Sequence, residues 1–194
     1  MDWPVAAGDF FLVAAAIGLV MAPVVGVAGG WSHARPVGLS ALAAFVMTFG
    51  LLAVSWRRIP GGVEAAAAGH AALLVSLLAL HQTGRAFRAA VTDPMLAGLA
   101  GIVLGISVTV APFALGPLMT DLPLGAYNSL LLANPLVTVA TASGIDFLHL
   151  DLIYRLSPLA HRGVALPAWT TACIGYAVFG GALFGASRLR YRSA

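Results

Sequence analysis

Polar and helix-breaking residues gather between Gly125 and Arg162, and the stretches before and after them are typical of plain membrane-spanning helices. Exposed backbone and charged side chains are costly in lipid, so such a mixture beside a membrane span needs a functional or packing reason. We expect this region to carry the function. The candidate transport or gating positions are Asn134, Pro135, Asp146, His149, Asp151 and Arg155.

The spacing of these side chains limits their chemistry. A short helix is expected from Ile145 to Leu156, on which Asp151 and Arg155 are four residues apart and can form an ion pair. Asp146 and His149 are three residues apart, but Asp151 points away from both on a helix, which disfavours a metal site. The sequence contains no His-Glu-x-x-His and no Gly-x-Ser-x-Gly motif, so we expect no enzyme and no catalytic residue.

Two histidines, His70 and His81, lie eleven residues apart in the apolar segment Val63–Gln82. On a helix they share a face and are about 16 Å apart along the axis. Such a pair could ligate haem, which would make the chain a structural or cofactor-holding subunit of a larger membrane complex. The alternative is that His70 faces the bundle interior with a hydrogen bond while His81 lies at the membrane interface. We expect no bound cofactor in that case.

The composition places these residues in a membrane. Of 194 residues, 60% are hydrophobic and 9% are charged, with a mean hydropathy of +0.96, whereas soluble domains carry about 25% charged residues. We therefore predict one polytopic, all-α transmembrane domain over residues 1–194. All ten basic residues are Arg, so Schiff-base chemistry at Lys is excluded. The pI near 9.6 comes from arginines beside the spans and does not indicate nucleic-acid binding.

About six spans are expected, with a short interfacial helix between the fifth and the sixth. The fifth is the least lipid-like, because Pro135 removes a backbone donor and frees a carbonyl. We interpret it as a broken or re-entrant helix; the alternative is an ordinary span with a proline kink. Gly101 with Gly105, and Gly181 with Gly185, offer close-packing faces. The six spans are Phe10–Gly29, Val37–Trp56, Val63–Gln82, Met95–Leu118, Leu124–Ser143 and Pro167–Ser187.

The arginines do not fix the orientation by count, since six spans leave five on each side. Those clustered after the second and last spans favour both termini in the cytoplasm, with residues 145–165 outside. If Leu124–Ser143 is instead re-entrant, five spans remain and the N-terminus lies outside.

Three short stretches resemble the C-terminal part of ABC-2-type permeases: Ala111–Phe113, Leu132–Leu136 and Asp151–Leu159, the last standing before the final span. The resemblance covers Met95 to Arg192. It implies a permease-like subunit in the inner or plasma membrane, with re-entrant outer helices and a basic end on the last span. It also implies a homo-oligomer or a partner membrane subunit. A Gly-x-x-x-x-Gly-Lys-Ser/Thr motif is absent, so the ATPase would be a separate chain.

Overall fold

The computed structural model describes residues 3–29, 62–110, 113, 122–146, 166 and 168–192. The predicted span Val37–Trp56 and the residues His149, Asp151 and Arg155 lie outside these ranges. All regular elements within the described ranges are helices, as expected for an all-α chain. They are α1 (Trp3–Gly29), α3 (Gly62–Ala90), α4 (Pro94–Thr109), α6 (Leu124–Leu132), α7 (Pro135–Ala142) and α9 (Trp169–Arg192).

Three of these helices are long and apolar enough to cross a membrane: α1 over Phe10–Ala28, the whole of α3, and α9 over Trp169–Ala186. With its 16 residues, α4 is also apolar, but at 1.5 Å per residue it extends only about 24 Å. A hydrocarbon core is about 30 Å thick. The structure therefore confirms an all-helical fold with candidate membrane spans, while six crossings are not shown within the described part of the chain.

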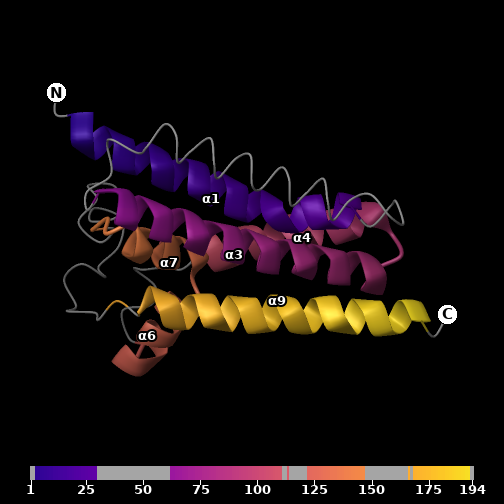
Figure 1. Cartoon of the computed structure of the whole chain (residues 1–194). Coiled ribbons are helices and arrows are strands. Elements are labelled where there is room, and N and C mark those ends of the chain that lie inside the picture. Colours follow the sequence, from indigo (N-terminus) through magenta and orange to yellow (C-terminus); the bar gives the residue numbers. More distant parts are fainter. Residues whose placement is uncertain are drawn as a thin grey trace.

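Helix α3 lies at the centre of the bundle and packs against α1, α4, α7 and α9 (Figure 1). Helices α1, α3 and α9 run in the same direction, and α4 runs back against them. The contacts give the same directions, because Phe11 meets His70 and Gly26 meets His81. The start of α9 therefore lies at the end of the bundle where α4 finishes, and the short helices α6 and α7 lie at that same end.

Glycines allow the backbones of α1, α3 and α4 to touch. A Cβ on Gly84 would collide with the carbonyl oxygen of Pro23, and one on Gly26 with that of His81. A Cβ on Gly105 would lie 2.5 Å from the carbonyl oxygen of Val20. The predicted close-packing face of α4, Gly101 with Gly105, therefore packs against α1.

On α9 the close contact with the described part of the chain falls on a different glycine from the predicted pair. Gly181 and Gly185 have no described atom within 4 Å, while Gly180 packs against Ala79 of α3. The spacing of small residues predicts a close-packing face, but it does not say which side of a helix its own chain covers.

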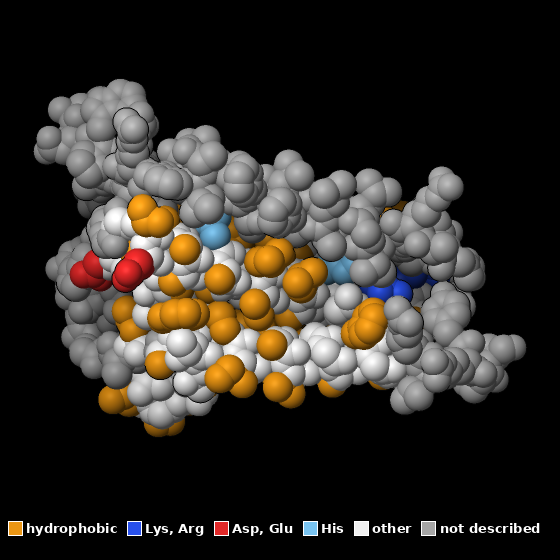
Figure 2. Space-filling view, viewed as in Figure 1, with side chains coloured by type: hydrophobic (Ala, Val, Ile, Leu, Met, Phe, Trp, Pro, Cys, Tyr) orange, Lys and Arg blue, Asp and Glu red, His pale blue; other side chains and the backbone are white. Residues whose placement is uncertain are grey.

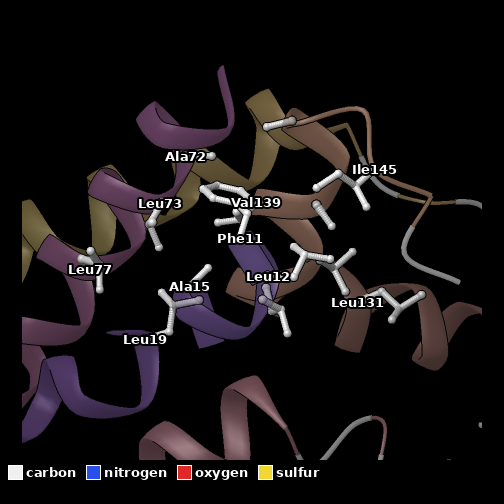
Figure 3. Close-up of a cluster of buried hydrophobic side chains, with 14 of the residues drawn as sticks. Phe11, Leu12, Ala15, Leu19, Ala72, Leu73, Leu77, Leu131, Val139 and Ile145 are labelled. Carbon is white, nitrogen blue, oxygen red and sulfur yellow. The ribbon is translucent and has the colours of Figure 1, made fainter. Parts of the chain in front are cut away.

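Large side chains fill the other half of the bundle, where α6 and α7 lie. Figure 3 shows Phe11 and Leu12 of α1 beside Leu73 of α3, Leu131 of α6 and Val139 of α7. All five are buried. Because residues from four helices meet here, this cluster holds the two short helices onto the continuous ones.

We predict that Gly105→Ala lowers the stability of the protein and Gly98→Ala does not. Both glycines are on α4, but a methyl group at Gly105 meets the backbone of Val20, while Gly98 has nothing within 4 Å. Overpacking of this kind costs about 1–3 kcal/mol. Thermal unfolding of each purified variant in detergent measures the difference. Equal Tm values for the two variants would contradict the close α1–α4 contact.

Candidate functional site: the break between α6 and α7

The fifth apolar segment is divided at Ala133 and Asn134 into two short helices. Helix α6 has 9 residues and α7 has 8, so their lengths are about 14 Å and 12 Å. Neither is long enough to cross a bilayer. The expected break is therefore present, and it lies at the predicted Asn134–Pro135 pair.

Asn134 joins three helices at the break. Its side-chain Oδ1 accepts hydrogen bonds from the backbone N–H groups of Leu136 (2.9 Å) and Val137 (3.1 Å), which caps α7. Its Nδ2 donates to the carbonyl oxygen of Thr109 (3.2 Å), the last residue of α4. Pro135 follows at the first helical position, where a missing N–H costs nothing. Asn134 is completely buried, so its polar atoms serve the fold and do not line an open surface.

Tyr176 of α9 closes the other side of the break. Its hydroxyl donates a hydrogen bond of 2.5 Å to the carbonyl oxygen of Ala133. The hydroxyl of Thr138 donates a hydrogen bond of 3.1 Å to the carbonyl oxygen of Asn134. An interruption of a helix inside an apolar core needs such partners. Sequence reasoning missed Tyr176, although a tyrosine within an apolar span is itself a signal, since a buried hydroxyl usually finds an acceptor.

One more polar contact holds α7 against α3. The Ser143 hydroxyl donates to the carbonyl oxygen of Val139 (2.8 Å) and lies directly against Gly69, where any Cβ would collide with it. Ser143 is completely buried. The residues after α7 therefore lie near the start of α3.

The described members of the predicted site lie in two places. Asn134 and Pro135 are buried in the junction, while Asp146 is exposed beyond the end of α7. Three other predicted positions, His149, Asp151 and Arg155, lie outside the described residues and stay predictions. Asp146 is at the end of the bundle where α3 begins with Glu64, and Figure 2 shows acidic side chains at this end.

Two buried polar atoms near the break have no hydrogen-bond partner within the described part of the chain. They are Oγ1 of Thr109, whose carbonyl binds Asn134, and Oδ1 of Asn128 on α6. Buried polar atoms in an apolar region are costly unless they are satisfied.

A groove of about 290 Å³ runs between α6 and α9 beside the junction. Leu132 and Ala133 line it from α6, and Ala172, Tyr176 and Phe179 line it from α9. The lining is almost entirely apolar. Such a lining favours apolar groups such as hydrocarbon chains.

Both histidines of α3 are buried, each with 6% of its surface exposed. The Nδ1 of His70 is 2.6 Å from the carbonyl oxygen of Ala66, and its ring centroid is 4.8 Å from that of Phe11. The Nε2 atoms of His70 and His81 have no hydrogen-bond partner among the described residues. Within those same ranges, no group of three or more His, Cys, Asp or Glu side chains is placed to hold a metal ion. The described geometry thus gives His70 a packing role.

Comparison with family models, with curated proteins and with solved structures found no match to this chain.

We predict that Asn134→Ala strongly destabilises the protein. The change leaves two N–H groups of α7 and the Thr109 carbonyl without partners, and a lost cap alone costs about 1–2 kcal/mol. Tyr176→Phe removes one hydrogen bond and should cost about 1 kcal/mol. Ser129→Ala is the control, because that exposed hydroxyl only bonds Gly125 of its own helix. Thermal unfolding in detergent should rank the three in this order. An Asn134→Ala variant as stable as Ser129→Ala would refute the capping role.

Proposed function

We propose that this chain is a permease-like membrane subunit of a transporter, ABC-2-like, energised by a separate ATPase chain. The observation that carries the proposal is the divided fifth segment. In a bundle whose other described helices are continuous, α6 and α7 meet at a polar junction held by the buried Asn134 and the half-buried Tyr176. Discontinuous helices at membrane depth are typical of transporters, where they stand beside the substrate path.

Two further features support this proposal. The short helices α6 and α7 precede the last helix in sequence and lie at the end of the bundle where that helix begins. The last helix, α9, then ends with Arg188, Arg190 and Arg192. Re-entrant outer helices followed by a final span with a basic end are what the resemblance to ABC-2-type permeases implies.

The arginines favour one orientation. Positions Arg85 and Arg88 in α3, and three more at the end of α9, all lie at the end of the bundle remote from α6 and α7. No other arginine is among the described residues. Arginine is enriched on the cytoplasmic side of membrane proteins, so this end is assigned to the cytoplasm. The junction of α6 and α7 then belongs to the outer half of the membrane.

This orientation favours five crossings over the expected six. Because α1 and α3 run in the same direction, the chain must pass from one end of the bundle to the other between them. Since α4 ends where α9 begins, the segment between them leaves and returns on the same side. The N-terminus is then outside and the C-terminus in the cytoplasm, as in the five-span alternative.

We predict that the full chain, purified in mild detergent, carries a nucleotide-binding ATPase in stoichiometric amount. Protein identification by mass spectrometry and ATP hydrolysis by the complex in liposomes measure this. We expect Asp146→Asn to lower the hydrolysis severalfold without changing the Tm, because Asp146 is exposed and lies outside the core. A fully functional preparation without any ATPase would refute the proposal.

We predict that cysteines at positions 92 and 146 are labelled from opposite sides of the membrane. The Thr92→Cys and Asp146→Cys variants would be made in a chain with Cys173→Ser, because Cys173 is the only cysteine. Both positions are exposed. A membrane-impermeant maleimide should reach residue 146 from outside and residue 92 from the cytoplasm. Six crossings require both to be labelled from the same side, and that result would exclude the five-span arrangement.

A further inference from the structure

We propose that the groove between α6 and α9 binds one acyl chain of a membrane phospholipid. The chain lies lengthwise along α9, with its headgroup end near Thr171 and its deeper part near Phe179, the first and last residues of α9 that line the groove. Holding a lipid is a property separate from the transport function proposed above. The outer leaflet as the source of the lipid rests on the orientation assigned above.

Each helix presents one continuous face to the groove. The lining residues are Ser129, Leu132 and Ala133 on α6, and Thr171, Ala172, Gly175, Tyr176 and Phe179 on α9. Spacings of three and four residues place side chains on one side of a helix. Gly175 leaves space halfway along the α9 face, because a Cβ there would have no described atom within 4 Å. The groove therefore follows the axis of α9.

The length of the groove matches the hydrocarbon of one leaflet. Thr171 and Phe179 are eight positions apart, which is about 12 Å along the helix axis. The candidate span of α9 begins at Trp169, and tryptophan is typical of the membrane interface. The groove thus starts about 3 Å below that level and covers most of the roughly 15 Å of one leaflet. An acyl chain from the headgroup region can follow it over this whole length.

A hydrocarbon chain also matches the chemistry of the lining, which is almost entirely apolar. The hydroxyls of Ser129 and Tyr176 already donate to backbone carbonyl oxygens, those of Gly125 (3.0 Å) and Ala133 (2.5 Å). A bound water molecule needs about two to four polar partners, so water is disfavoured here. An empty groove would leave its lining atoms without dispersion contacts. The groove is therefore filled by an apolar group from its surroundings.

The size and the setting of the groove favour a lipid chain over a helix of another protein. Only 11% of the candidate span of α9 is buried inside the bundle, so acyl chains surround most of this helix in a bilayer. The volume of about 290 Å³ is roughly twice that of a cavity that binds benzene, and it holds about a dozen carbon atoms. A helix segment 12 Å long and about 10 Å wide fills roughly 900 Å³. A single acyl chain fits the groove, whereas a second helix does not.

The test uses the purified full chain in a detergent with a rigid steroid body, because such a detergent has no flexible chain to place in the groove. Phosphatidylcholine with a diazirine halfway along one acyl chain is added at one equivalent, and peptide mass spectrometry locates the adducts after illumination. We expect adducts at groove residues such as Leu132 and Phe179. The side chains of Ile174 and Val178 are 65% and 67% exposed but do not line the groove, so they should carry severalfold fewer adducts.

Gly175→Leu is the principal variant, because its side chain would occupy the groove from a position with open space around the Cβ. Gly181→Leu is the matched control. It adds the same side chain at an equally open position of α9, about 120° around the helix from Gly175. We expect the groove adducts, and the fraction of chains that retain a lipid in native mass spectrometry, to fall severalfold in Gly175→Leu and to stay unchanged in Gly181→Leu.

Adducts that follow exposure alone, with Ile174 and Val178 labelled as strongly as the groove, would overturn the proposal. An equal loss in both variants would do the same. Groove residues without adducts in the unmodified chain would mean that a protein segment fills the groove, and the lipid assignment would be wrong. Glycerophosphocholine, the same headgroup without acyl chains, should not compete, and competition by it would move the site to the headgroup. The labelling pattern of the unmodified chain decides the matter even if Gly175→Leu fails to fold.

Discussion

The close approach of three backbones is the contact on which the rest of the bundle depends. Where α1 passes α3 and α4, the glycines Gly26, Gly84 and Gly105 bring the Cα of one helix against the carbonyl oxygen of the next. A bilayer supplies little hydrophobic driving force between helices, so dense packing and weak Cα–H···O contacts must supply the affinity. Small residues at these positions therefore decide whether α3 can sit between its neighbours, and α3 in turn supports α7 and α9.

The opposite half of the bundle is held together differently. There α6 and α7 are too short to form long packed faces, and polar contacts add to the buried apolar cluster that holds them: Asn134 to Thr109 of α4, and Tyr176 to Ala133. Single hydrogen bonds contribute about 1 kcal/mol each, whereas the glycine contacts let backbones pack directly against each other. One half is thus held by backbone packing at glycines, and the other by large side chains and a few hydrogen bonds.

The sequence predicts what depends on local rules and misses what depends on distant partners. The break at Asn134–Pro135 was predictable, because proline and a capping side chain act on their own helix. The pair Gly101 and Gly105 was predictable for a similar reason. Tyr176 was not, since its acceptor lies 43 residues away. The relative directions of the helices could not be predicted either, because they follow from tertiary contacts such as that of Gly26 in α1 with His81 in α3.

The two halves of the bundle differ both in how their helices pack and in the charges that they carry. The tightly packed half carries the arginines of α3 and α9, while the half built from short helices carries Glu64 and Asp146. For the permease-like subunit proposed above, this division would hold one half at a headgroup region while the other half rearranges, because arginines at a headgroup region resist vertical and tilting motions. Separation of α6 from α9 along the apolar groove would break the Tyr176 hydrogen bond, while Asn134 would still hold α7 to α4. The glycine contacts of α1, α3 and α4 would remain intact throughout, so these three helices need not move for the junction to open.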